Sequence, residues 1–231
     1  MILEIVATNL KDVKNAEEYG ADRIELISAM TELGLTPSYG LIKEAVSSVD
    51  IPINVIIRPH NQSFVYDEND LQTMVTDIQM VKKLGVNGIV IGPLTHDKKI
   101  DEQVLQVLLE AAGDLDVTFH RAFDFANNQV ESLKTLMTYK GITSILTAGG
   151  DYQAPEAVKE INQLIDIAND SHLKIMIGNG LRLRNLDEFC ANIKQVNALH
   201  FGSDVRINRS PNMPLDRERV KKIKAIMKKH S

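Results

Sequence analysis

The chain has 231 residues, of which 44% are hydrophobic and 25% are charged, and its formal net charge at pH 7 is −5. This composition is typical of a soluble globular protein that buries a large core. The negative charge argues against a general nucleic-acid-binding protein, and no apolar run approaches the length that spans a membrane.

Cys190 is the one cysteine of the chain, which excludes a disulfide framework. Met1 leads directly into an apolar segment of strand type, so we expect no signal peptide. Both features lead us to expect a cytoplasmic protein. Since Cys190 lies in a segment with helical spacing, we predict a packed thiol and not a nucleophile.

Short apolar runs alternate with longer amphipathic segments along the whole chain. The predicted strands occupy residues 2–6, 23–27, 53–57, 88–92, 117–120, 144–149, 174–178 and 198–202. The predicted helices occupy residues 10–20, 38–49, 70–85, 101–113, 130–141, 155–170, 185–195 and 215–229. Eight strand–helix units predict an α/β protein with a single (β/α)8 TIM-type barrel domain over residues 1–231. An open doubly wound sheet is the alternative.

The polar residues of the predicted strands can be sorted by strand alternation, which in a barrel sends every second side chain into the lumen. The inward set is Glu4, Glu25, Arg58, Thr118, His120 and His200. Most of them lie toward the carboxyl ends of their strands, where barrel active sites form. We therefore predict a polar pocket at that mouth. Ion pairs that only stabilise the fold are the alternative.

The stretch VTFHRAFD (Val117–Asp124) ends a predicted strand with three polar groups. Alternation directs His120 into the lumen and Arg121 toward the helix layer. Asp124 lies in the following loop, where we expect it to belong to the pocket and to orient a neighbour by hydrogen bonding.

Glycine-rich turns follow the sixth, seventh and eighth predicted strands, as TAGG, GNG and GS. Glycine lets backbone N–H groups approach an anion, and barrels often bind phosphate with the loops after strands seven and eight. We predict an anion or phosphate cradle, with tight turns as the alternative. Its candidate residues are Gly149, Gly150, Gly178, Gly180, Gly202 and Ser203.

Several segments resemble the CutC family, whose members are often called copper homeostasis proteins. In chain order they are GADRIEL (Gly20–Leu26), GLTPS (Gly34–Ser38), IIRP (Ile56–Pro59), VTFHRAFD (Val117–Asp124), LTAGG (Leu146–Gly150) and LHFGS (Leu199–Ser203). The resemblance implies a cytosolic TIM-type barrel that forms a homodimer or a higher homo-oligomer. It also implies an association with copper tolerance or copper binding, so copper is the expected metal.

The chain departs from the family in residues that bear on copper. Many relatives carry cysteines after the first strand and after RIEL, where this chain has Val6, Ala7, Thr8 and Ile27. Cu(I) prefers thiolate and thioether ligands. The remaining candidate ligands suit Cu(II) or Zn(II), and they are Glu4, Glu25, His120 and His200.

Three functions stay open at this point. The first is copper handling, as the resemblance implies. The second is a barrel enzyme of the isomerase, aldolase or lyase type that acts on a small anionic or phosphorylated metabolite, with a lumen carboxylate as general base and a histidine that polarises an oxygen. Arg58 and Arg121 would then hold the anion, and Lys174 begins its strand too far from the mouth to form a Schiff base. The third is a non-catalytic oligomeric scaffold.

Overall fold

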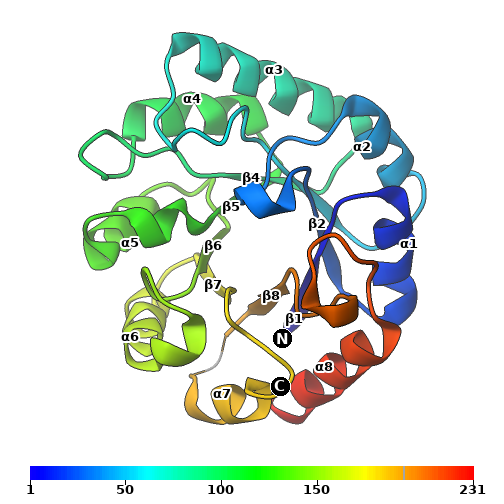
Figure 1. Ribbon diagram of the computed structural model, residues 1–231. Coiled ribbons are helices and arrows are strands. Elements are labelled where there is room, and N and C mark those ends of the chain that lie inside the picture. Colours follow the sequence, from blue (N-terminus) through cyan, green and yellow to red (C-terminus); the bar gives the residue numbers. More distant parts are fainter. Residues whose placement is uncertain (195) are drawn as a thin grey trace.

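The computed structural model, which describes residues 1–194 and 196–231, confirms the predicted barrel. Eight parallel strands close in the order β1-β2-β3-β4-β5-β6-β7-β8, and the eight α-helices lie outside them (Figure 1). The open doubly wound sheet is wrong, because β1 pairs with β8.

The elements follow the predicted order. The strands are β1 (Ile2–Ala7), β2 (Arg23–Leu26), β3 (Ile53–Ile56), β4 (Gly88–Ile91), β5 (Asp116–Phe119), β6 (Ser144–Thr147), β7 (Lys174–Ile177) and β8 (Ala198–Phe201). The α-helices are α1 (Leu10–Tyr19), α2 (Tyr39–Val46), α3 (Glu68–Leu84), α4 (Glu102–Ala112), α5 (Gln129–Met137), α6 (Val158–Ala168), α7 (Leu186–Asn192) and α8 (Arg217–Lys229). Gln195, the last residue of one predicted helix, lies outside the described residues.

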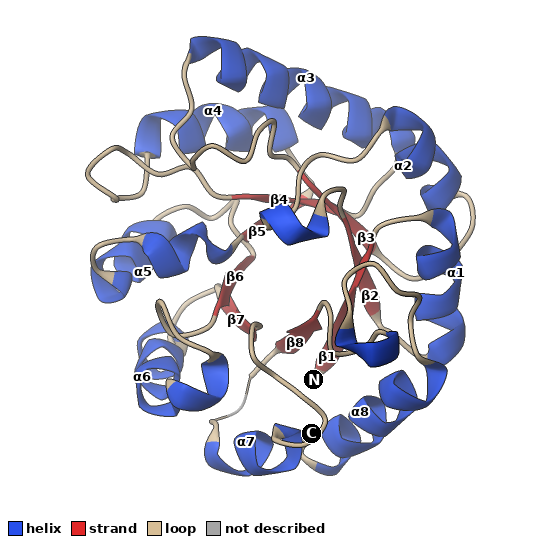
Figure 2. Ribbon diagram, viewed as in Figure 1, coloured by secondary structure: helices blue, strands red, loops and turns tan. Residues whose placement is uncertain are grey.

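Four short 3₁₀ helices interrupt the loops: η1 (Met30–Glu32), η2 (Arg121–Phe125), η3 (Ala154–Glu156) and η4 (Ile207–Arg209). Each lies in a segment that leads from the carboxyl end of a strand to the next α-helix. In Figure 2, η1 is the short helix drawn over the interior of the barrel, and η4 is the one drawn beside β1. They therefore lie on the face where the candidate residues were expected.

Local signals explain where the long helices begin and end. Asp67 accepts hydrogen bonds from the amides of Asn69 and Asp70 and so begins α3 with a capping box. Gly85 ends α3 in the left-handed conformation, with φ of 82°, which glycine adopts at little cost. The apolar face of α8, with Val220 and Ile223, is buried, as expected for a surface helix. Across the described chain, no helix combines the length and the apolar character that crossing a membrane requires.

Strand alternation divides the interior into a shell and a lumen. The large apolar core lies between strands and helices and includes Leu3 and Ile5 of β1. The lumen holds two smaller apolar clusters. Val6 belongs to the one nearer the carboxyl ends and Ile2 packs against the other, so Glu4 lies between two apolar layers. A charge at that position needs partners close by.

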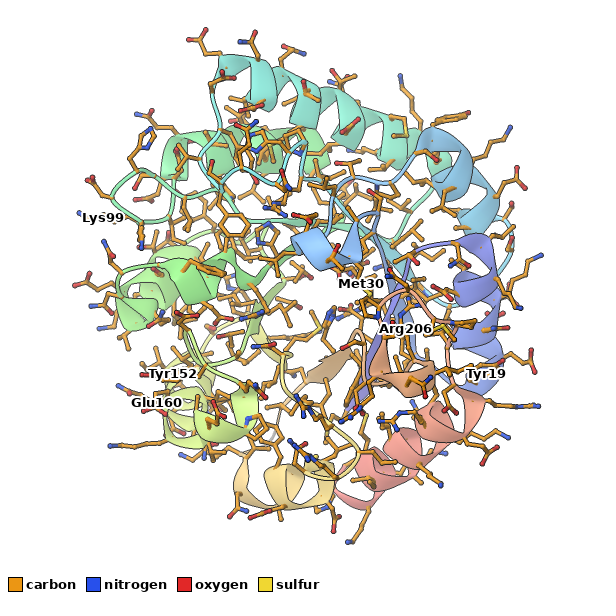
Figure 3. All side chains as sticks on the ribbon, in the orientation of Figure 1. Tyr19, Met30, Lys99, Tyr152, Glu160 and Arg206 are labelled. Atoms are coloured by element: carbon orange, nitrogen blue, oxygen red, sulfur yellow. The ribbon has the colours of Figure 1, made fainter. Side chains whose placement is uncertain are left out.

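A buried ion pair connects the loop after β8 to α1. The Arg206 side chain is 1% exposed, and its Nη2 donates to Oδ2 of Asp12 at 2.8 Å and to the carbonyl of Val6 at 3.1 Å. Its Nη1 donates to the carbonyl of Met213 at 2.8 Å. Figure 3 shows Arg206 between the loop that contains η4 and α1. The pair thus fixes a long loop at the barrel mouth to the first strand–helix unit.

We expect Asp12→Ala to lower the free energy of unfolding by about 3 kcal/mol or more, because it leaves the Arg206 charge buried without its partner. Urea unfolding of both proteins measures the difference. The control is Asp166→Ala, which removes the exposed partner of Lys194 and should cost less than about 1 kcal/mol. Equal losses in the two variants would contradict this account of the Arg206 pair.

Candidate functional site

A cavity of about 530 Å³ opens at the carboxyl ends of the strands. Its walls combine lumen residues such as Ile56 and Leu146 with loop residues after β2, β5, β7 and β8. Met30 of η1 lines the cavity as well, and Figure 3 places it over the middle of the barrel. A volume in this range suits a small-molecule ligand.

Strand register gathers charged groups in one row across the closing seam. Glu4 is opposite Arg23 of β2 and opposite His200 of β8. Its carboxylate accepts from Nε of Arg23 at 2.5 Å and from Nδ1 of His200 at 2.8 Å. The other nitrogen of His200, Nε2, lies 3.7 Å from Oε2 of Glu25. Glu25 and His200 line the cavity, and Glu4 supports His200 from below.

The surroundings drive the pKa values of these groups apart. Burial alone would raise the pKa of Glu4, but the hydrogen bond from His200 and the charge of Arg23 outweigh it and lower that pKa. Burial raises the pKa of Glu25 to about 7, against the opposing attraction of His200. The carboxylates of Glu4 and Glu25 raise the pKa of His200 although burial opposes them. Glu25 can therefore take up or release a proton near neutral pH.

His120 lines the same cavity, but its pKa is shifted in the direction opposite to that of His200. Its Nδ1 accepts the amide proton of Ala122 at 3.0 Å, which begins η2. The ring packs beside Phe64, with 5.1 Å between the ring centroids. Burial, with the charges of Arg58 and Arg121, lowers the pKa of His120 to about 3. The imidazole is therefore neutral at physiological pH.

Arginines surround the mouth of the cavity. Arg121, Arg182 and Arg209 all line it. Arg121 donates from Nε to Asp124 at 2.8 Å. Within residues 1–194 and 196–231, the guanidinium groups of Arg182 and Arg209 have no carboxylate partner. Two unpaired cations at one mouth favour an anionic ligand.

Backbone strain is concentrated at this mouth. Six non-glycine residues of the described chain have positive φ. Four of them line the cavity: Leu33, Asn179, Asn208 and Arg209. Such conformations cost energy and persist where the surrounding structure enforces them, commonly at functional sites.

Two residues predicted to belong to the pocket, Arg58 and Asp124, form hydrogen bonds to the backbone of nearby loops. Arg58 is 3% exposed, and its Nη1 donates to the carbonyls of Glu32 at 2.5 Å and Gly34 at 3.0 Å. Its guanidinium also lies 4.8 Å from the centroid of Phe64. Arg58 therefore holds the η1 loop over the mouth, and contrary to expectation it is not among the residues that line the cavity.

Asp124 orients its neighbour Arg121 by hydrogen bonding, as expected. It does not line the cavity, however, because its carboxylate also binds the loop after β6. It accepts from Oγ1 of Thr147 at 2.5 Å and from the amides of Ala148 at 3.0 Å and Gly150 at 3.3 Å. The amide of Gly149 donates to Oγ1 of Thr147 at 2.9 Å. The amides of the predicted cradle at Gly149 and Gly150 are thus engaged by Thr147 and Asp124 of the protein itself, which corrects that part of the expectation.

The loops after β7 and β8 place their glycines differently. Gly178 faces the lumen, where an added Cβ would lie 3.1 Å from Cδ2 of His200. Gly178 therefore makes room for His200 and is not among the residues that line the cavity. Gly180, Gly202 and Ser203 line the cavity, where they can still approach an anion.

Some residues of the cavity were missed or misplaced from the sequence. Arg121 lines the cavity and does not face the helix layer, because β5 ends at Phe119 and strand alternation stops there. Arg182 comes two residues after the GNG turn (Gly178–Gly180), and this position could have identified it as a cavity residue. Arg209 gives no such signal, since the turn of η4 alone brings it to the mouth. Cys190 is buried, as predicted, and burial raises its pKa to about 11.

The residues of the cavity do not suit a resident copper ion. Among the described residues, no three His, Cys, Asp or Glu side chains lie together as metal ligands would. Nδ1 of His200 is engaged with Glu4, and Nδ1 of His120 is engaged with Ala122. Each imidazole would have to give up a buried hydrogen bond or a proton before it could bind a metal.

Fold and cavity together define a closed parallel α/β barrel with an ionisable pocket at the carboxyl ends of its strands. The chain belongs to the CutC family, which matches it over residues 1–205.

Named relatives agree with this assignment. The human copper homeostasis protein cutC homolog is 36% identical over 212 residues, which cover 92% of this chain and 76% of the relative. A CutC family protein of Klebsiella pneumoniae is 40% identical over 198 residues, which cover 85% and 79%. The crystal structure of a copper homeostasis protein CutC from Streptococcus agalactiae superposes with a TM-score of 0.80 at 34% identity, covering 87% of this chain and 98% of that one.

We expect the stability of the wild type to fall relative to Glu25→Gln as pH rises from 5 to 8. The pKa of Glu25 is raised to about 7 in the folded state. Its contribution to stability is therefore complete below the unfolded value and is lost as pH rises through 7. The difference should approach about 3 kcal/mol at pH 8, as measured by urea unfolding at several pH values. A constant difference across this range would contradict the raised pKa.

Proposed function

We propose that this chain is an enzyme of the CutC family that binds a small anionic metabolite and transfers a proton with Glu25. The observation that supports this most directly is the placement of Glu25. Its carboxyl group lines a cavity of about 530 Å³ and has a pKa of about 7. A general base is most effective when its pKa lies close to the working pH.

His200 and Glu4 act as a support for this base. The hydrogen bond from Nδ1 of His200 to Glu4, at 2.8 Å, fixes the imidazole with Nε2 toward Glu25. Glu4 raises the pKa of His200 and so favours the imidazolium, whose charge compensates Glu25 when Glu25 is ionised. Glu25 is thus the group that exchanges a proton with the ligand, and His200 and Glu4 are positioning residues.

The anionic part of the ligand is assigned to the loops after β7 and β8. Arg182, Arg209, Gly180, Gly202 and Ser203 all border this side of the cavity. Arginine binds carboxylate and phosphate groups through paired N–H donors. Phosphate-binding barrels often use the same two loops. An isomerase, aldolase or lyase acting on a carboxylated or phosphorylated metabolite fits this arrangement best.

The connection of this chain with copper rests on its relatives alone. Their names connect the family with copper homeostasis, and we propose that this chain contributes to it without a tight resident copper ion. The cytoplasmic location and the homo-oligomeric state expected from the sequence stay predictions.

We expect the purified protein to bind Cu(I) weakly in competition with a chromogenic chelator. The positions at the carboxyl ends of β1 and β2 carry Val6, Ala7, Thr8 and Ile27 and no thiol. Weak binding should be the same in wild type and in His120→Ala. A tight one-to-one site that this substitution abolishes would contradict the proposal.

We expect inorganic phosphate and phosphorylated sugars at millimolar concentration to raise the melting temperature. A tenfold excess over Kd stabilises a protein by about 1.4 kcal/mol, which corresponds to roughly 3–6 °C for a chain of this size. Arg182→Gln and Arg209→Gln should reduce the shift, because each removes an unpaired cation from the mouth.

The matched control is Arg184→Gln, which removes an exposed arginine of the same loop that does not line the cavity. It should leave the shift unchanged. Gly202→Val should also reduce the shift, since an added Cβ would lie 2.7 Å from Cε of Met30 and fill the mouth. If no anion raises the melting temperature of the wild type, or if all four variants respond alike, the proposal of an anionic ligand is wrong.

A further inference from the structure

His120 presents an unused hydrogen-bond donor at the cavity. Its Nδ1 accepts the amide proton of Ala122 at 3.0 Å, so in the neutral ring the proton resides on Nε2. Nε2 is buried and has no hydrogen-bond partner within the described chain. An unsatisfied buried donor costs about 1–3 kcal/mol, which a ligand oxygen would offset.

The surroundings hold this donor in place. The ring of His120 packs beside Phe64, and Arg58 covers Phe64 at 4.8 Å from its centroid. On the other side the ring occupies the space above Gly92, where any side chain would overlap it. Since Nδ1 is fixed to the start of η2, the ring cannot turn over without losing that bond.

His120 and Glu25 approach the cavity from different sides. His120 follows β5 and Glu25 belongs to β2, and two strands, β3 and β4, separate them in the closed sheet. Both line the same cavity. A ligand between them would meet a carboxylate on one side and a neutral N–H donor on the other.

We propose that His120 donates Nε2–H to the carbonyl oxygen of the substrate, and that the substrates are small hydroxycarbonyl or oxo compounds with an anionic tail. This inference rests on the proposed function and adds the chemical class of the substrate. The carbon next to the carbonyl loses its proton to Glu25, the C–H electron pair becomes the C=C bond, and the carbonyl π pair moves to the oxygen. The oxygen then carries the charge that His120 stabilises, and the reverse step returns the proton.

Neutrality of the donor matters for this step. Nearby cations, Arg58 and Arg121, together with burial, keep His120 from taking up a second proton. A neutral imidazole stabilises a developing oxyanion by hydrogen bonding and keeps its own proton. Among the described residues, Glu25, Glu4, His200 and Arg23 are further ionisable groups of the lumen. The first three provide the base.

The test uses the full chain, 15N-labelled at histidine, and 2-phosphoglycolate as the probe that joins an oxyanion to a phosphate. We expect long-range 1H–15N NMR to show His120 as the Nε2–H tautomer, unchanged from pH 5 to pH 8. Saturating 2-phosphoglycolate should shift its Nε2–H signal downfield. An imidazolium or an Nδ1–H tautomer at neutral pH would overturn the inference.

Two substitutions separate the donor from the structural role. In His120→Asn the side-chain oxygen can still accept from Ala122, but no atom replaces Nε2. We expect this substitution to weaken the binding of 2-phosphoglycolate about tenfold or more and to leave the binding of inorganic phosphate unchanged. In His120→Gln an amide can replace the Nε2 donor, so part of the affinity should return.

The outcomes distinguish this inference from the proposed function. If neither 2-phosphoglycolate nor inorganic phosphate stabilises the wild type, the proposed anion-binding pocket and the proposed ligand contact of His120 are both contradicted. If 2-phosphoglycolate binds but the His120 signal does not move, or if His120→Asn weakens both probes equally, only the role of His120 is overturned.

Discussion

Closure of the sheet between β1 and β8 is the constraint on which the candidate site depends. Parallel pairing fixes which residues share a row, so Glu4 lies between Arg23 and His200. The same closure places Glu4 between two apolar layers of the lumen, away from water. A carboxylate there is stable only with both partners. The pair with His200 then orients the imidazole toward Glu25, which makes the closing seam of the barrel the support for the proposed base.

The cavity contains two histidines in opposite states, and the reason lies in their neighbours. His200 faces two carboxylates, which raise its pKa. His120 faces Phe64 and lies near two arginines, so burial and like charge lower its pKa to about 3. Environments that separate the pKa values of similar groups commonly assign acid, base and hydrogen-bond donor in an active site. Here they leave Glu25 to exchange a proton and His120 to donate a hydrogen bond.

Polar residues at the mouth fall into two kinds. Asp124 satisfies the amides of Ala148 and Gly150, and Arg58 satisfies the carbonyls of Glu32 and Gly34. These contacts bind both side chains to the backbone of neighbouring loops and so shape the rim. Arg182 and Arg209 lack such partners in the described chain, and they face the cavity. A ligand is therefore expected beside Arg182 and Arg209, whose guanidinium groups have no partner in the described chain, and not beside the charged groups that already bind the backbone.

The sequence by itself determined the eight strand–helix units, because the alternation of apolar strands and amphipathic helices is a local pattern that needs no tertiary information. Closure of these units into a barrel was decided by the pairing of β1 with β8. The sequence also determined that Glu4, Glu25, His120 and His200 face inward, since alternation within a strand decides this. Tertiary structure decided where the polar side chains beyond the strand ends point. Where Asp124 and Arg121 point depends on the turn of η2, and the approach of Arg209 depends on that of η4. The charge states of Glu25 and His120 likewise depend on burial and on groups from distant strands, which no local pattern encodes.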